Sequence, residues 1–186
     1  MRSLVVTTAL LAAVACSQKD APPEGTPQTP FGTPAQVGEY LTRIDPYVQE
    51  VGRIEAAVET ALSSERAGSA ERRGTGSNLA DAATRARPQL QRVLEEFDAI
   101  EPPPLLAPFH RDVKKLMLVR LEAYATIAAG WEAEQAGREY RTIYDRAEAG
   151  LRDANGLIQQ LNAQMARINQ SLEPIQAQSQ AEANGG

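Results

Sequence analysis

The sequence has few of the residues that build redox or catalytic centres. Its 186 residues include one cysteine and one histidine, His110, and only 5% are aromatic. One cysteine excludes an intramolecular disulfide framework and the CxxCH signature of c-type haem. One histidine excludes the paired Glu-x-x-His motifs of di-iron bundles, and without a G-x-S-x-G turn it leaves no nucleophilic triad. We therefore expect no enzyme activity, no metal and no cofactor.

Long basic runs are missing as well. The formal net charge is −5, and removal of Arg2 with an N-terminal signal would leave 18 basic and 24 acidic side chains, or about −6. Nucleic acids are bound largely through basic side chains that neutralise phosphates. The acidic composition therefore predicts that the chain does not bind nucleic acid.

The N-terminus has the pattern of an export signal. Arg2 precedes an apolar run of 11 residues, Leu4 to Val14, and small residues lead from there to Cys16. At about 1.5 Å per residue this run covers roughly 16 Å of a hydrocarbon layer about 30 Å thick. Because it is too short to cross a membrane, residues 1–15 are predicted to be a signal peptide that is cleaved between Ala15 and Cys16.

The segment Ala13-Val14-Ala15-Cys16 resembles the lipobox of bacterial lipoproteins, where small residues precede a cysteine at the end of the apolar run. The resemblance implies attachment of diacylglycerol to Cys16 and cleavage before it by signal peptidase II. Ala13 stands where that family usually has leucine. The same residues also satisfy the rule for ordinary secretory cleavage, so a secreted protein without lipid is the alternative.

A lipidated Cys16 would make the membrane the first partner of the protein. Each buried methylene contributes about 0.8 kcal/mol, and two acyl chains hold a protein stably. The expected location is the cell envelope. Ser17 follows the cysteine where lipoproteins kept in the inner membrane often have aspartate, so the outer membrane is expected if the cell has two membranes.

Residues 16–36 are predicted to be the lipidated cysteine followed by a proline-rich linker. Five prolines and two glycines lie between Ser17 and Gln36, with hardly any large apolar side chains. Such a composition is typical of a disordered tether, part coil and part polyproline II. The tether would hold a folded domain away from the lipid surface but near it.

Residues 37–173 are predicted to form one helical domain. They contain four apolar runs with the three- and four-residue spacing of amphipathic helices, and no period-two alternation that would indicate strands. Short connections make successive helices antiparallel neighbours. The predicted fold is therefore all-α, an antiparallel up-down-up-down four-helix bundle with kinked helices. The runs extend from Val37 to Leu62, Leu79 to Ile100, Leu105 to Trp131 and Tyr140 to Leu172.

Four residues interrupt these runs. Pro46 predicts either a kink or a fresh helix start with Asp45 as its cap, and Pro88 predicts a kink. Gly156 lies in a run whose apolar phase continues, so one long helix is expected there. Pro174 should end that helix, which leaves residues 174–186 as a disordered tail.

Several residues are candidates for binding. His110 with Met117 or Met165 is the alternative in which the bundle holds a non-covalent haem; otherwise His110 is expected to be partly exposed in the first turn of its helix. An aromatic group near one end of the bundle is expected to be packing rather than a ligand pocket. Its members are Trp131, Tyr124, Tyr140 and Tyr144.

Basic residues form two small groups, Arg72 with Arg73, and Arg111 with Lys114 and Lys115. They are candidates for basic patches on an acidic body. Ion pairs within a helix, such as Asp112 with Lys115, explain the second group equally well.

The layout, with the segment PPPLLAPFHRDVKKL after the second run, resembles small helical envelope lipoproteins that have no assigned activity. The resemblance implies a non-enzymatic, membrane-anchored module that contacts an envelope protein or the cell wall. The alternative is a four-helix bundle that binds a ligand or cofactor as a sensor or carrier.

Overall fold

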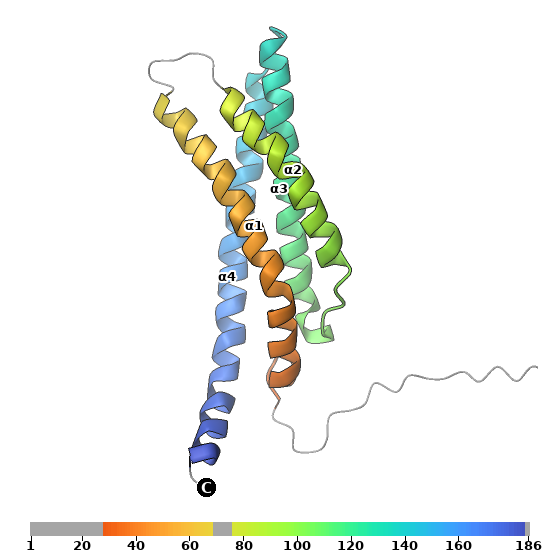
Figure 1. The fold of residues 1–186 in the computed structure, drawn as a ribbon, viewed down its shortest axis with the longest axis vertical. Helices are drawn as coiled ribbons and strands as arrows, with labels where there is room; N and C mark the ends of the chain where they lie inside the picture. The colour runs from red at the N-terminus through yellow and green to blue at the C-terminus, as the bar shows by residue number, and fades with distance from the viewer. Residues whose placement is uncertain (1–27, 69–75, 185–186) are drawn as a thin grey trace, which may run out of the picture.

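The computed structural model describes residues 28–68 and 76–184, which form four long helices (Figure 1). α1 and α3 run in one direction, and α2 and α4 run in the other. Within the described residues there is no β-strand, only a single bridge between Thr29 and Gly32. The predicted all-α, up-down-up-down arrangement is therefore confirmed. The elements are α1 Pro34–Gly68, α2 Gly76–Asp98, the 3-10 helix η1 Pro104–Leu106, α3 Ala107–Gln135 and α4 Arg141–Asn184.

α1 begins three residues before the predicted start of the domain, because Thr33 caps it. The Gln36 N–H donates to Thr33 Oγ1 (3.3 Å) and the Thr33 N–H donates to Gln36 Oε1 (3.2 Å), which is the reciprocal pattern of a capping box. Upstream, Phe31 packs against the core. Residues 28–36 of the predicted linker are thus ordered, whereas residues 1–27, including the predicted signal peptide, lie outside the described residues.

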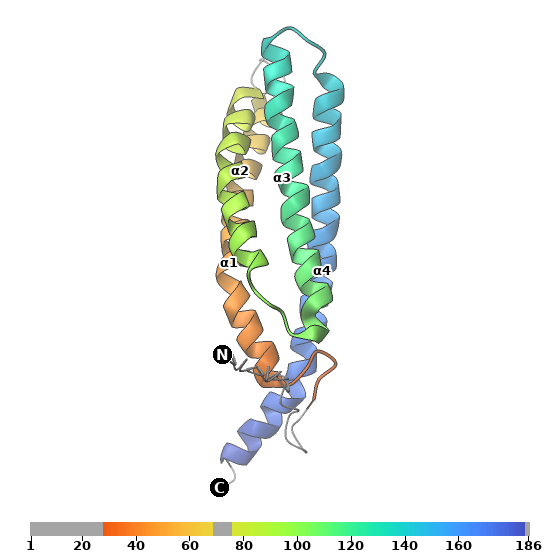
Figure 2. The same ribbon diagram turned by 90° about the vertical axis from the view of Figure 1, so that its right-hand side faces the viewer.

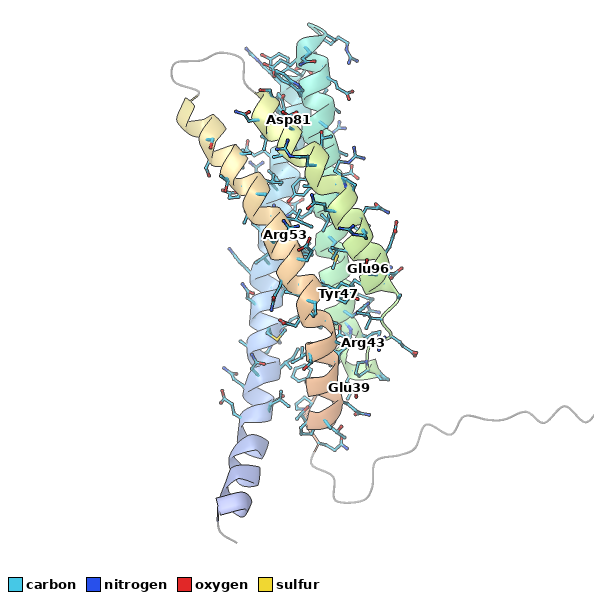
Figure 3. All side chains as sticks on the ribbon, viewed as in Figure 1. Glu39, Arg43, Tyr47, Arg53, Asp81 and Glu96 are labelled. Carbon is cyan, nitrogen blue, oxygen red and sulfur yellow. The ribbon has the colours of Figure 1, made fainter. Side chains whose placement is uncertain are left out.

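Neither Pro46 nor Pro88 breaks its helix. α1 continues through Pro46 and α2 through Pro88. Both prolines are exposed, so water is available to the carbonyl that loses its hydrogen-bond partner. α1 changes direction near Tyr47 (Figure 3), which is the kink, rather than the fresh start, that Pro46 predicted. α4 is likewise continuous through Gly156.

The predicted end of α4 is wrong, because the helix continues through Pro174 to Asn184. Residues 175–183 are mostly alanine, glutamine and glutamate, which have high helix propensity and carry the helix past one missing hydrogen bond. This last part of α4 extends beyond the other three helices (Figures 1 and 2).

The connection between α3 and α4 is built around Gly137. Its φ of 64° lies in the left-handed region that glycine adopts at little cost. The Arg138 N–H returns to the Ala133 carbonyl (2.9 Å), which closes the last turn of α3. Glu139 then caps α4 by accepting hydrogen bonds from the N–H groups of Arg141 (2.9 Å) and Thr142 (3.2 Å).

The core lies along the faces that successive helices share. α1 packs on α2, α2 on α3 and α3 on α4, whereas α1 and α4 hardly approach each other. Gly130 lets the last pair come close, since a Cβ at this position would lie 2.7 Å from the ring of Tyr144. The bundle is therefore closed along three of its sides and open along the fourth. The largest fully buried side chains include Ile44, Ile54, Leu90, Phe97, Met117, Tyr124, Ile127 and Ile168.

Candidate functional site

The candidate site is the open side of the bundle, which we call the α1–α4 seam. Figure 2 shows α1 and α4 on opposite sides of α3, which forms the floor between them. Two hollows open along the seam, and residues of α1, α3 and α4 line both. A polar bridge made by Glu55, Arg120 and Asn155 separates them.

The polar bridge joins three helices through one guanidinium group. Arg120 of α3 donates from Nε to Glu55 Oε1 of α1 and from Nη2 to Asn155 Oδ1 of α4, both at 2.8 Å. The side chain of Arg120 is 9% exposed and that of Glu55 is 19% exposed. Because α1 and α4 share so little backbone contact, this pair of hydrogen bonds is a main connection between them.

Burial opposes the charge on Glu55. Desolvation raises the pKa of Glu55, and the charge and hydrogen bond of Arg120 offset this only in part. An ion pair of this kind is a weak source of stability, because the cost of removing two charges from water is close to their attraction. Its clearest contribution is geometric, since it fixes the position of α1 relative to α4.

Tyr124 lies one turn beyond Arg120 on α3 and is completely buried. Among the described side chains, its hydroxyl is the one fully covered polar group without a hydrogen-bond partner. Burial raises the pKa of Tyr124 to about 12, with smaller effects from the charges of Arg120, Glu55 and Glu59. These effects place the phenol close to the polar bridge.

The upper hollow, on the side of the bridge toward the α3–α4 turn, has a volume of about 400 Å³. Its walls are apolar and come from Leu62, Leu79, Ile127 and Leu151. Arg120 and Asn155 form its polar end, and charged side chains of α1 and α4 stand at its edge. Those edge residues are Glu59, Glu148 and Arg152.

The lower hollow, on the other side of the bridge, is smaller and almost entirely apolar. Its volume is about 280 Å³. Val51, Met117 and Leu161 are buried in its lining, and Val48 on the α1 edge is 42% exposed. A Cβ added to Gly52 would meet nothing within 4 Å, so this edge of the seam is open.

His110 does not line either hollow of the seam. It is 6% exposed, and its ring stacks on Phe97 with 4.2 Å between centroids. Its Nδ1 forms a hydrogen bond of 3.0 Å with the hydroxyl of Tyr40. The expectation of a partly exposed His110 is therefore wrong, because three helices cover the ring. Burial lowers the pKa of His110, as expected for a neutral imidazole in the core.

This geometry does not support the alternative in which the bundle holds a non-covalent haem. His110 uses Nδ1 for Tyr40 and one ring face for Phe97, and Met117 is fully buried within the core. Within residues 28–68 and 76–184, no group of three or more histidine, cysteine, aspartate or glutamate side chains is placed to hold a metal ion.

The predicted aromatic cluster forms only in part. The rings of Tyr140 and Tyr144 meet edge to face at 5.9 Å, and the Tyr144 hydroxyl donates to Glu134 (3.1 Å). Trp131 is half-buried. Tyr124 lies farther along α3, beside the polar bridge, and so belongs to the seam.

The basic residues do not gather into one patch. Lys114 pairs with Asp98, while Arg111 and Lys115 are exposed. Asp112 accepts a hydrogen bond from Gln164 of α4 (2.6 Å) rather than forming an ion pair with Lys115 of its own helix. Arg72 and Arg73 lie outside the described residues.

The outer faces of α1 and α2 carry charges of both signs, and Figure 3 labels five of them, with Tyr47 also marked. All five are exposed, and Arg53 lies between Glu50 (2.6 Å) and Gln89 (3.1 Å). A mixed, solvated surface of this kind does not single out a binding partner. The labelled charged residues are Glu39, Arg43, Arg53, Asp81 and Glu96.

Cys16 and Ala15, the predicted lipidation and cleavage residues, lie outside the described residues. Among the described helices, none is both long enough and apolar enough to cross a membrane. Comparison with protein families, curated proteins and solved structures finds no match to the chain.

The polar bridge predicts how unfolding depends on pH. The folded state holds the Glu55 proton more tightly than the unfolded chain, so ionisation of Glu55 weighs against folding as pH rises from the ordinary value of 4.5 through the raised pKa. Glu55→Gln cannot ionise. Relative to the parent, the variant should gain free energy of unfolding as pH rises through this range, as measured by urea denaturation.

Glu50→Gln provides the matched control, with the opposite sign. The hydrogen bond from Arg53 lowers the pKa of Glu50, so its ionised form favours folding above 4.5 and that contribution is lost on acidification. Relative to the parent, this variant should lose free energy of unfolding as pH rises. The same slope for both variants would contradict the account of the polar bridge.

Proposed function

We propose that the chain is a lipid-anchored lipoprotein of the cell envelope whose helical bundle is a non-enzymatic binding module. The likeness of Ala13-Val14-Ala15-Cys16 to a lipobox supports the anchor, and the proline-rich segment after it supports a tether. Ser17 favours the outer membrane in a cell that has two membranes. The partner on this proposal is an envelope protein rather than nucleic acid.

The observation that carries the binding role is the open α1–α4 seam. A closed four-helix bundle packs its first helix against its fourth, whereas here α1 and α4 hardly approach each other and two hollows lie between them. An uncovered apolar groove with a polar edge is typical of an interaction site. The lower hollow is such a groove, bordered by the exposed Val48.

The chemistry of the lower hollow favours the apolar face of a partner helix as its occupant. Valine, leucine, methionine and phenylalanine side chains line it, with Glu55 and Asn162 as its polar members. Cell-wall glycan is polar and would leave its hydroxyl groups unpaired against such a surface. A protein partner is therefore proposed ahead of the cell wall.

A second candidate function is the binding of a small ligand in the upper hollow. Its volume of about 400 Å³ lies within the range of small-molecule sites. The guanidinium of Arg120 supplies a polar group beside apolar walls, and the buried, unpartnered hydroxyl of Tyr124 belongs to the next turn of α3, although Tyr124 does not itself line the hollow. On this view the bundle is a carrier or sensor.

The anchor has a direct test in Cys16→Ser. The serine cannot form the thioether to diacylglycerol, so the variant should lose incorporation of a labelled fatty acid and appear in the soluble fraction. Cys16 is the only cysteine of the chain. Retention of the label or of membrane association by the variant would contradict the lipid anchor.

The seam has its own test, by photo-crosslinking in cells. A photoreactive amino acid at Val48, on the edge of the lower hollow, should capture one discrete protein. The matched control is Leu118 on α3, which is 48% exposed against 42% for Val48 and does not line the seam hollows. Capture should occur at Val48 and not at Leu118.

The adduct at Val48 must also disappear when Gly52→Trp fills the open edge of the seam. Adducts with the same abundant proteins at both positions would contradict the binding role. A high-mass adduct at Val48 that a muramidase releases would instead identify the cell wall as the partner.

A further inference from the structure

We infer that the upper hollow binds an uncharged, elongated amphipathic molecule whose carbonyl-type oxygen accepts hydrogen bonds from Arg120 and Tyr124. The inference rests on the second candidate function and specifies the class of its ligand. An acyl ester or an acyl amide has this chemistry.

Arg120 has N–H donors that are not used within the protein and are available to such an acceptor. A guanidinium carries five N–H donors, and Arg120 uses one for Glu55 and one for Asn155. Arg120 also lines the upper hollow. Of the described side chains, only Tyr124 has a fully covered polar atom that lacks a partner. The remaining donors of Arg120 are therefore not sealed in the core, and they face the hollow.

The Tyr124 hydroxyl provides a second, independent indication of a ligand. A buried hydroxyl without a partner is unfavourable, because it has lost its hydrogen bonds to water and gained none within the protein. Tyr124 stands between Arg120 and Ile127 on one face of α3, and both of these neighbours line the upper hollow. Tyr124 does not itself line the hollow, so on this inference its hydroxyl reaches a polar ligand atom held by Arg120 only when the wall of the hollow moves.

The charges around the hollow favour an uncharged ligand. Two positive groups, Arg120 and Arg152, stand against three negative ones, Glu55, Glu59 and Glu148. Arg120 is neutralised by Glu55 and Arg152 is paired with Glu148 (2.9 Å). A carboxylate would be repelled by the negative charge of Glu59, which no cation among the described side chains offsets. An ammonium group offers no acceptor for the unused N–H donors of Arg120.

The apolar part of the ligand follows from the walls. Leu62, Leu79, Ile127 and Leu151 come from all four helices and leave an open mouth between α1 and α4. A chain of about ten carbons would bury its methylenes against these side chains, which is favourable because it removes apolar surface from water. A flat or highly polar molecule would leave these apolar side chains in contact with water.

The test is calorimetric titration of the full chain carrying Cys16→Ser, so that no attached lipid competes. The probes share one alkyl length and differ in their heads: decanoylglycerol is neutral, decanoate is anionic and decyltrimethylammonium is cationic. All are used below their micellar concentrations. Decanoylglycerol should bind saturably at one site and more tightly than both charged probes.

Tyr124→Phe is the decisive variant, because it removes only an unpartnered oxygen. It should fold at least as stably as the parent and bind decanoylglycerol about 5- to 10-fold more weakly, the effect of one hydrogen bond. The matched control is Tyr47→Phe, since Tyr47 packs on Phe97 of α2 and does not line the hollow. It should leave binding unchanged.

The outcomes separate the inference from the function on which it rests. Saturable binding that prefers a charged head, or that Tyr124→Phe leaves unchanged, would overturn the inference and keep a ligand site. Failure of all three probes to bind would overturn both the inference and the ligand-binding function. Crosslinking at Val48 would still decide the protein-binding proposal independently.

Discussion

The geometry of this bundle depends on the buried guanidinium of Arg120. Three of its four long helices meet at that group, α3 by carrying it, α1 through Glu55 and α4 through Asn155. No other described ion pair joins α1 to another helix through a side chain as deeply buried. A buried ion pair contributes little net stability, but it restricts the arrangements in which its partners are satisfied. Arg120 therefore fixes how far apart α1 and α4 stand.

The two hollows are a consequence of this restriction. α1 and α4 are held together at one level of the seam, and a hollow lies between them on each side of that level. The bridge gives the hollows different chemistry, since the upper one includes the guanidinium and the lower one is almost wholly apolar. A small amphipathic ligand and the face of a partner helix are thus proposed for separate parts of one seam. A change at the bridge would affect both.

Much of the fold could be predicted from the sequence because it depends on local rules. The spacing of the apolar residues predicted the four helices, and the short connections predicted that successive helices run antiparallel. Residues 28–36 were predicted to be linker because they belong to a segment rich in proline and poor in large apolar side chains, although Thr33 and Gln36 form a capping box. Pro174 was predicted to end a helix that its alanine- and glutamine-rich continuation sustains.

The candidate site was harder to predict because it depends on which helices fail to meet. On α3 the apolar Leu121 is only half-buried, whereas the neighbouring Arg120 is buried. A signal was present, since Arg120 lies three residues after Met117 and four before Tyr124 and so shares their face. Its partners Glu55 and Asn155 are 65 and 35 residues away. Only the packing of the whole bundle brings them together.

The central claim is that Arg120 holds α1 and α4 at a fixed separation. Pulsed electron paramagnetic resonance measures this directly, with nitroxide labels at Ala56 of α1 and Gln159 of α4, both exposed, in chains that carry Cys16→Ser. Labels at Glu122 and Arg146, on the packed α3–α4 side, are the reference pair. The account predicts a narrow α1–α4 distance distribution that Arg120→Met broadens, while the reference pair stays unchanged. An α1–α4 distribution of the same width with and without Arg120, or equal broadening of both pairs, would contradict it.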